Sequence, residues 1–354
     1  MINILKQLIK DKFSLIALIV LIFIYTALLF ADFIAPYTKD FSDRNLSYVP
    51  PSPIFTINEK GRLSRPYTYN YKREFDENLL ETTYKLDRSK KYYIKIFGKG
   101  MPYKAFGIIP MKRHLITVEN EGRLYLLGGD INGRDVFSRL LFGGRISMTI
   151  GFLALFVLFP IGLLYGGISG YFGGKVDILM MRFAEAVMSI PSFYLLIILA
   201  AILPPNMTSI QRFILIVIIL ALIGWAGFAR VVRGMVLSIK TQEFVESAKS
   251  IGLSNIKIIL KHILPQTTSY VIVAMTLSVP GYILSESGLS FLGLGIQQPD
   301  ASWGNMLKEA QEYTNILYRP WLLTPGFLIF VAVLSFNLIG DTIRDILDPK
   351  SKVR

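Results

Sequence analysis

The sequence predicts an all-α polytopic membrane protein with six transmembrane helices and a small β-rich external domain inserted between the first two. Hydrophobic residues make up 52% of the 354 residues, and they are gathered in blocks. Six blocks approach the roughly 20 residues that an α-helix needs to cross a bilayer. These blocks are Phe13–Ala35, Ile146–Ile168, Ile178–Leu203, Phe213–Val232, Thr267–Phe291 and Trp321–Gly340.

The basic residues between the blocks predict the orientation of the chain. If the N-terminus is inside, the short outer loops hold only Arg212, Lys308 and Arg319, and the other short segments are rich in lysine and arginine. Because short cytoplasmic loops carry an excess of these residues, both termini and the segment 233–266 are expected in the cytoplasm. The charge pattern therefore predicts a multi-pass membrane protein with cytoplasmic termini, and the family resemblance given below implies the plasma (inner) membrane.

Composition excludes several classes of protein. The formal net charge is +13, but many basic residues sit in short loops beside apolar blocks, unlike the basic face of a nucleic-acid-binding domain. No cysteine is present, and the two histidines, His114 and His262, lie in unrelated segments. Thiolate chemistry is therefore excluded, and a histidine metal site or a Ser-His triad is disfavoured.

The first apolar block has two interpretations. Lys6, Lys10 and Lys12 precede it, as basic residues precede the core of a signal peptide. Its length exceeds the roughly 7–15 residues of such a core, and Ala31-Asp32-Phe33 is not a small-x-small cleavage site. An uncleaved membrane anchor is favoured.

The polar region 36–127 follows this anchor and is predicted to be external. Residues alternate between apolar and polar at 67–71, 92–97 and 115–118, and glycines separate these runs, which predicts short strands with turns. Residues 36–145 hold 20 Lys and Arg against 12 Asp and Glu, a net charge of +8. One hypothesis is that this basic face attracts an acidic solute-binding protein, and the other is that it lies solvated against the outer leaflet.

The segment 233–266 predicts a bent helical hairpin on the membrane surface. Phe244, Ala248 and Ile251 share one face of a first short helix, and apolar residues from Ile256 to Leu264 line a second. Gly252 allows a sharp turn between them. Ser254 is expected to cap the second helix and Pro265 to end it.

This hairpin resembles the signature of the transmembrane subunits of binding-protein-dependent ABC importers. That signature reads Glu-Ala-Ala, three residues, Gly, nine residues, then Ile-x-Leu-Pro. Ser247 replaces the first alanine and His262 occupies the isoleucine position, while the other positions match. The matching residues are Glu246, Ala248, Gly252, Leu264 and Pro265. The resemblance implies that the hairpin docks on a separate ATPase; an amphipathic hairpin without a partner is the alternative.

A second stretch, 129–147, resembles the block before the second span of dipeptide and oligopeptide permeases. It contains Gly-Arg-Asp at 133–135 and Ser-Arg at 138–139, with Gly129 where threonine is usual. From the residues alone we expect an Asn-Gly turn and then an amphipathic helix whose Arg134 and Arg139 reach lipid head groups. A calcium loop is rejected because its twelfth position is Leu141.

Two glycine series favour close helix packing. Gly143, Ser147 and Gly151 repeat every fourth residue, as do the glycines at 162, 166, 170 and 174. Small residues at this spacing let helix backbones approach within lipid. Prolines at 160 and 191 are candidates for kinks in the second and third spans.

Few ionisable residues lie in or near the spans, and each is a candidate for the transport pathway or for pairing. Arg182, Glu185 and Arg230 fall near cytoplasmic ends, where an interfacial pair suffices. Glu286 lies toward the outer end of the fifth span. It precedes a Ser-Phe-Leu-Gly-Leu-Gly stretch and Trp303-Gly304, which also resemble the permease family.

The resemblance covers nearly the whole chain and implies a permease subunit of an ATP-driven importer of oligopeptides or dipeptides. Its implied partners are a homologous second permease, two cytoplasmic ATPases, an external solute-binding protein and the lipid bilayer, but no nucleic acid. The chain itself is expected to bind no cofactor, and ATP binds to the ATPases. Import of nickel or oligosaccharides is an alternative, and a polytopic membrane enzyme is a rival without a catalytic constellation. The expected parts are 1–35, 36–127, 128–345 and the tail 346–354.

Overall fold

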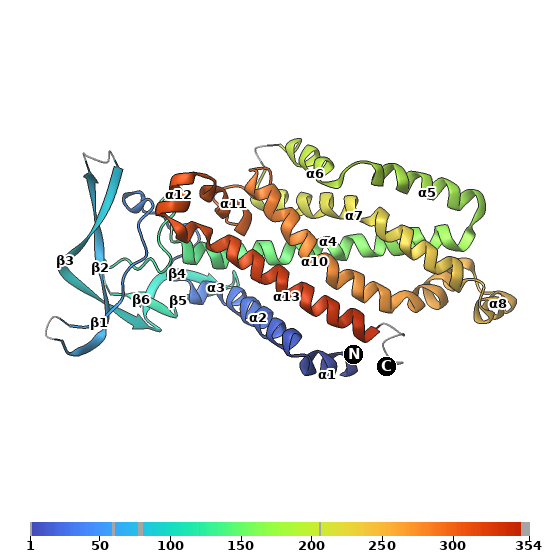
Figure 1. Ribbon diagram of the computed structural model, residues 1–354, viewed down its shortest axis with the longest axis horizontal. Coiled ribbons are helices and arrows are strands. Elements are labelled where there is room, and N and C mark those ends of the chain that lie inside the picture. The colour runs from blue at the N-terminus through green and yellow to red at the C-terminus, as the bar shows by residue number, and fades with distance from the viewer. Residues whose placement is uncertain (1, 59–60, 77–80, 120, 205–206, 348–354) are drawn as a thin grey trace. The chain divides into compact units, whose positions relative to one another are not determined.

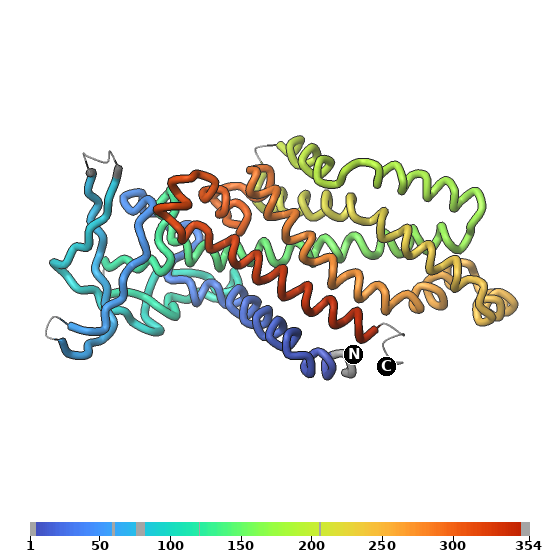
Figure 2. Tube along the Cα trace, viewed as in Figure 1, coloured from blue at the N-terminus to red at the C-terminus, as the bar shows by residue number. Residues whose placement is uncertain are grey.

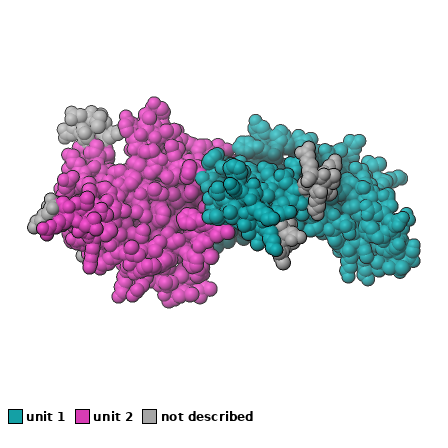
Figure 3. Space-filling view, turned by 60° about the horizontal axis from the view of Figure 1, so that its bottom comes forward, with its two compact units in different colours: residues 1–21, 148–289, 330–354 teal, residues 22–147, 290–329 magenta. Residues whose placement is uncertain are grey.

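The computed structural model describes residues 2–58, 61–76, 81–119, 121–204 and 207–347. The chain divides into two compact units (Figure 3). One unit consists of residues 1–21, 148–289 and 330–354, and the other of residues 22–147 and 290–329. Most of the predicted tail 346–354 lies outside the described residues.

Long apolar helices form most of the first unit, and parts of some of them belong to the second. Within the described ranges, five helices are long and apolar enough to cross a membrane. They are α2 (Lys12–Leu29), α4 (Val136–Phe172), α7 (Ser209–Ile239), the continuous helix Asn255–Phe291 that contains α10 (Thr268–Phe291), and Pro320–Leu347, which contains α13 (Thr324–Leu347). A sixth candidate is the bent pair α5 (Gly174–Ser189) and α6 (Ser192–Ala201).

The bend between α5 and α6 lies at the predicted proline. The two helices meet at 78°, and Pro191, which cannot donate a backbone hydrogen bond, separates them. Pro160 lies inside α4 instead, without ending it. The predicted third block is thus two helices with a sharp break.

Shorter helices complete the fold, and some predicted boundaries move. The helix α4 begins ten residues before the predicted Ile146, because the expected amphipathic helix is continuous with the span. The first block is divided at Phe30, where α2 ends and α3 follows.

The short helices outside the segment 240–267 are α1 (Ile2–Lys10), α3 (Ala31–Ile34), η1 (Arg44–Leu46), α11 (Trp303–Leu307), η4 (Lys308–Gln311), α12 (Tyr313–Tyr318) and η5 (Pro320–Leu323).

The helices α4 and α7 pack backbone to backbone through the predicted glycine series (Figure 1). A Cβ atom on Gly162 would lie 2.5 Å from the Phe228 ring, and one on Gly170 would lie 2.8 Å from the carbonyl oxygen of Arg233. Residue numbers rise together along both helices, so α4 and α7 are parallel. Gly174 does not belong to this contact, since nothing lies within 4 Å of its Cβ position.

The beginning of α2 lies beside the end of α13, both within the first unit (Figure 2). The hydroxyl oxygens of Ser14 and Thr342 are 2.5 Å apart, and the Ser14 hydroxyl donates to the Leu338 carbonyl at 3.4 Å. These two helices are therefore antiparallel neighbours.

The β-strands belong to the second unit and lie between α3 and α4 in the chain. A four-stranded antiparallel sheet has the order β1 (Phe55–Ile57), β2 (Leu63–Asp76), β3 (Glu81–Ile96) and β6 (Ile116–Val118). A separate antiparallel hairpin is formed by β4 (Lys99–Ala105) and β5 (Ile109–Arg113). The three predicted alternating runs fall on β2, β3 and β6, except that Phe97 and Leu115 lie just outside the strands. The β4–β5 hairpin was not predicted.

We expect the α4–α7 contact to be sensitive to a single methyl group. Gly166→Ala would place Cβ against the carbonyl oxygen of Ala229 and 2.8 Å from the Val232 Cβ. Overpacking of this kind costs about 1–3 kcal/mol, so thermal unfolding in detergent should begin at a lower temperature. Gly234→Ala, in the same helix pair with nothing within 4 Å, is the matched control and should not lower it. Equal behaviour of the two variants would contradict the contact.

Candidate functional site

The predicted hairpin forms two short helices joined by a tight turn. The first is α8 (Glu243–Ser250), and the second is α9 (Asn255–Ile258). Gly252 has a φ of +78°, and its amide donates to the Lys249 carbonyl at 2.9 Å. The Leu253 amide donates to the Ala248 carbonyl at 3.2 Å. This pattern is a Schellman motif, which uses glycine because the left-handed conformation penalises a side chain.

The hairpin is anchored to the end of α4. Val245 and Ala248 are buried on the inner face of α8. The Tyr171 hydroxyl donates to Asn255 Oδ1 at 2.9 Å, and the Lys249 ammonium lies 5.6 Å from the centre of the Tyr171 ring. The ends of both helices are thereby tied to one aromatic residue of α4.

The outer face of the hairpin is apolar and exposed. Its large side chains are Phe244, Ile251, Ile256 and Leu260, of which Ile251 is 76% exposed. Glu246 and Ser247 are also exposed, on the same helix as Phe244. We call these six residues the coupling surface. Because large apolar side chains in water are unfavourable when they cluster, this surface has the character of a protein contact.

Parts of the prediction for this segment were wrong. The segment 233–266 begins inside α7, which continues to Ile239. Pro265 does not end the second helix: a π-helical turn (Ile259–Ile263) and a 3-10 turn (Leu264–Thr267) carry it directly into α10. The proline is tolerated because it occupies the first turn of the 3-10 segment, where an amide hydrogen is not required.

The predicted coupling residues do not all share one surface. Glu246, Ser247 and Gly252 are exposed, whereas Ala248 is buried. Leu264 is half-buried, with one methyl group 3.2 Å from the Cβ position of Gly167, while Pro265 is exposed. Ser254 occupies the N-cap position of α9 without a side-chain hydrogen bond.

A network of charged residues, which was not predicted from the sequence, holds the C-terminal end of α7. Asp177 accepts from the Arg233 guanidinium, with Nε at 2.9 Å from Oδ1, and from the Ser169 hydroxyl at 2.6 Å. Lys240 donates to the Gly170 carbonyl at 2.8 Å, near the end of α4. A cation at a helix C-terminus also compensates the helix dipole. A lone aspartate between two apolar blocks was the signal that could have identified this network.

The other ionisable candidates differ in burial. Glu185 lies between two arginines, 3.4 Å from Arg182 and 3.4 Å from Arg230, and all three side chains are exposed. Glu286 in α10 is fully buried, and the Ser287 hydroxyl lies 3.5 Å from its carboxylate. Charge burial of this kind in a membrane helix is costly, so Glu286 is the stronger candidate for a functional role.

In the second unit, the two stretches that resemble the permeases lie against each other. Trp303 donates from its indole to the Leu140 carbonyl at 2.9 Å and from its amide to the Ser147 hydroxyl at 3.1 Å. The Cβ position of Gly143 lies 3.2 Å from Ala301 and Ser302. Residues separated by about 160 positions thus form one compact structure, which explains why small residues occur at 143 and 147.

A buried charge cluster lies at the centre of this structure. One oxygen of Asp130 accepts from the amides of Asn132 at 2.8 Å and Arg134 at 3.0 Å. The other accepts from the Arg134 guanidinium at 2.7 Å and lies 3.4 Å from that of Arg139. Arg139 also donates to the Pro299 carbonyl at 3.2 Å. The expectation that Arg134 and Arg139 reach lipid head groups was wrong, because both are buried on Asp130.

Two further carboxyls in this region have raised pKa values. Burial raises the pKa of Asp135 to about 7, although its Oδ2 accepts from the Ser138 amide at 2.8 Å and hydroxyl at 2.6 Å. Burial and then the charge of Asp130 raise the pKa of Glu309, which accepts from the Ile131 amide at 3.1 Å. The buried Oδ1 of Asp135 has no hydrogen-bond partner among the described residues.

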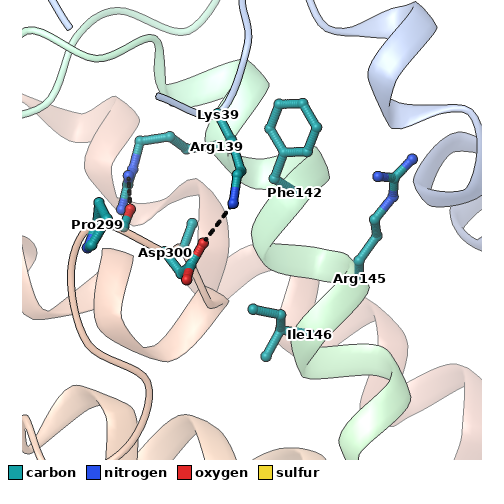
Figure 4. Close-up of a pocket in the computed structure, with 8 residues that line it drawn as sticks. Lys39, Arg139, Phe142, Arg145, Ile146, Pro299 and Asp300 are labelled. Atoms are coloured by element: carbon teal, nitrogen blue, oxygen red, sulfur yellow. Dashed lines mark hydrogen bonds and ion pairs between the residues drawn. The ribbon is translucent and has the colours of Figure 1, made fainter. Parts of the chain in front are cut away.

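A pocket of about 190 Å³ opens beside this cluster (Figure 4). Lys39 pairs with Asp300 across it at 3.4 Å, and Arg139 is bonded to Pro299. Pockets for drug-sized ligands measure about 300–1,000 Å³. The pocket is therefore small for a peptide, and polar groups of its wall already pair with one another.

Comparison with known proteins identifies the class of this chain. Residues 159–353 match the family described as binding-protein-dependent transport system inner membrane component. The protein belongs to this family, since the match covers more than half of the chain. It is therefore a multi-pass membrane protein and a transport subunit that works with other subunits, not an enzyme.

A more particular similarity is to the C-type permeases. Residues 2–51 match the N-terminal transmembrane domain of oligopeptide transport permease C. The chain is 45% identical over 229 residues to the oligopeptide transport system permease protein OppC of Haemophilus influenzae, covering 64% of this chain and 71% of that one. It is 44% identical over 225 residues to the dipeptide transport system permease protein DppC of Bacillus subtilis, covering 63% and 68%. It is 42% identical over 226 residues to a glutathione transport system permease protein GsiD of Escherichia coli, covering 64% and 72%.

The raised pKa of Asp135 predicts a pH dependence of stability. The pKa of the Asp135 carboxyl is about 7 in the folded protein, whereas the ordinary pKa of an aspartate is 3.8. The folded state then binds more protons, so stability falls as pH rises from about 4 to about 7. In Asp135→Asn, which keeps an oxygen for Ser138, the decline in Tm over this range should be smaller. Tm measured in steps from pH 4 to pH 8 tests this, and parallel curves for the two proteins would contradict it.

Proposed function

We propose that this chain is the translocation subunit of an ATP-driven, binding-protein-dependent importer of oligopeptides or dipeptides. Its relatives are named for oligopeptides, dipeptides and glutathione, which supports peptides as the cargo class. The implied partners are a homologous permease, two cytoplasmic ATPases that bind ATP, and an external solute-binding protein. Nickel and oligosaccharides remain the alternative cargoes.

The coupling surface carries this proposal. It presents exposed apolar side chains beside the acidic Glu246 on a hairpin that is anchored to α4 and continuous with α10. A partner that binds this surface can therefore displace the hairpin and α10 together. In this arrangement, ATP-driven closure of the ATPases would rock the permease between inward-open and outward-open states.

The glycines that link α4 and α7 support six spans rather than five. Parallel helices separated by one connection require that the connection itself crosses the membrane. The only helices between them are α5 and α6 within the described part of this connection, so the bent pair is the missing span. Six spans also place the start of α2 and the end of α13 on one side, which agrees with the contact between Ser14 and Thr342.

The six spans determine the sides of the membrane that we propose for the other parts of the chain. With both termini in the cytoplasm, the coupling surface is cytoplasmic as well, and the β-strands between α2 and α4 form the external domain. The proposed parts are the anchor 1–35, the external insertion 36–127, the core 128–345 and the tail 346–354. Glu286 is the pathway or gating candidate, while Arg182 and Glu185 are accounted for by their exposed ion pair.

The topology can be tested directly, because the chain has no native cysteine. We expect Ser250→Cys, in α8, to react with a membrane-impermeant maleimide only in inside-out vesicles. Arg88→Cys, in β3, should react only in right-side-out vesicles. The same pattern for both positions would exclude the proposed orientation.

Variants of the coupling surface test the docking proposal. Glu246→Lys should reduce ATPase co-purification and uptake of a labelled peptide by about tenfold or more, as for loss of a charged contact at an interface. Gly252→Val should have a similar effect, because a β-branched residue at φ +78° strains the turn by about 1–2 kcal/mol.

Matched controls separate docking from folding. Glu121→Lys makes the same charge change at an exposed site in the other unit, and Gly252→Asn keeps a residue that tolerates the left-handed conformation. Both should retain ATPase binding, and all four variants should insert into the membrane. Full ATPase association by Glu246→Lys and Gly252→Val would show that the hairpin is not the docking site.

A further inference from the structure

The β4–β5 hairpin ends in an exposed apolar turn that the proposed function does not use. Phe106 is 54% exposed, Ile108 is 81% exposed, and Ile109 is 54% exposed. Lys104 and Lys112 flank this turn on the two strands, and both are exposed. We call Phe106, Ile108 and Ile109 the hairpin tip. Apolar side chains in water at the end of a hairpin, with cations just behind them, are typical of a segment that enters a membrane interface.

The backbone of the turn places a phenylalanine where it is unfavourable. Phe106 has a φ of +52° and Gly107 a φ of +76°, and the Ile108 amide donates to the Ala105 carbonyl at 3.1 Å. Two successive positive φ angles define a type I′ turn, whose first central position is normally asparagine, aspartate or glycine. A bulky residue there costs free energy, so its presence points to a role for the ring at the tip.

Contacts with the end of the first span orient the hairpin. At its base, the Leu115 amide donates to the Phe33 carbonyl at 2.7 Å, and His114 Nδ1 lies 2.6 Å from the Ala35 carbonyl oxygen. At its tip, the Phe106 ring lies 6.1 Å from the ring of Phe30. The base therefore sits beside residues 33–35 and the tip beside residue 30. Since α2 precedes residue 30, the hairpin points back toward the apolar helix.

The hairpin tip lies beside the residue at which the apolar helix α2 ends. Phe30 follows the last residue of this helix and is 44% exposed. Two residues further on, Asp32 pairs with the guanidinium of Arg145 at 2.8 Å, and Arg145 also donates to the Leu28 carbonyl at 2.6 Å. Charged groups return to the chain at this level, as they do where a span leaves the hydrocarbon region.

We propose that the hairpin tip inserts into the membrane interface beside α2, with Lys104 and Lys112 on lipid phosphates. The occupant of this apolar surface is lipid, because the surface is continuous with the lipid-facing side of a candidate span. The lysine stems would lie along the apolar boundary with their ammonium groups at the head groups. The inference requires that α2 crosses the bilayer, and it is independent of the transported solute.

Single-cysteine labelling measures the depth of the tip. The full chain with Ile108→Cys, carrying an environment-sensitive fluorophore, is reconstituted into vesicles of phosphatidylcholine and phosphatidylglycerol. The emission maximum should shift to shorter wavelength. Lipids with a nitroxide near the head group should quench the fluorescence strongly, and aqueous iodide should quench it only weakly. Leu63→Cys is the matched control, since Leu63 is also aliphatic and is 90% exposed at the start of β2. Its label should be quenched by iodide and unaffected by the nitroxide lipids.

A second variant tests the lysines and keeps the proposal falsifiable. Lys104→Glu with Lys112→Glu, in the Ile108→Cys background, should make the label more accessible to iodide on vesicles that contain phosphatidylglycerol. Equal iodide quenching at positions 108 and 63 would overturn the proposal. Protection of position 108 that appears only when other transporter subunits are present would also overturn it, because the tip would then contact protein. Transport is not part of this readout, so its result does not depend on the proposed function.

Discussion

The close packing of α4 against α7 is the constraint on which the membrane part depends. Glycines at 162, 166 and 170 let the two backbones approach closely. Successive glycines contact successively later residues of α7, so the two helices are parallel. In the topology that we propose, α5 and α6 therefore return the chain across the bilayer. At the end of the contact, Asp177 of α5 binds both Arg233 of α7 and Ser169 of α4, and Lys240 donates to the Gly170 carbonyl of α4. The hairpin of α8 and α9 follows this junction in the chain.

Polar groups in the two units are satisfied in different ways. In the helical unit, Asp177 pairs with Arg233, Glu185 lies between two exposed arginines, and Glu286 is fully buried. In the other unit, Asp130 gathers two arginines and two backbone amides in a buried cluster. A buried carboxylate is tolerated there because its charge is matched and its oxygens accept several hydrogen bonds. This cluster joins the stretch before α4 to the loop after α10, because Arg139 donates to the Pro299 carbonyl.

The β-rich insertion lies outside both family matches. Neither match includes residues 52–158, which hold all the strands that the structure describes. Contacts between His114 and Ala35 and between Leu115 and Phe33 hold the strands to the end of the first apolar block. The apolar tip that we assign to lipid would add a second attachment beside the same helix.

The sequence by itself determined the membrane class, the apolar blocks, the hairpin turn at Gly252, the break at Pro191 and three of the sheet strands. These features depend on local composition and on residues with special backbone conformations, which short segments reveal. The sequence could not determine that Arg134 and Arg139 are buried, that α9 continues through Pro265 into α10, or that Asp177 binds Arg233. Arg139 donates to the Pro299 carbonyl 160 residues away, and Asp177 binds Arg233 56 residues away. The continuation through Pro265 depends on neighbouring turns that supply alternative hydrogen bonds. Only the tertiary structure decides them, because burial and charge pairing are properties of residues that the fold brings together.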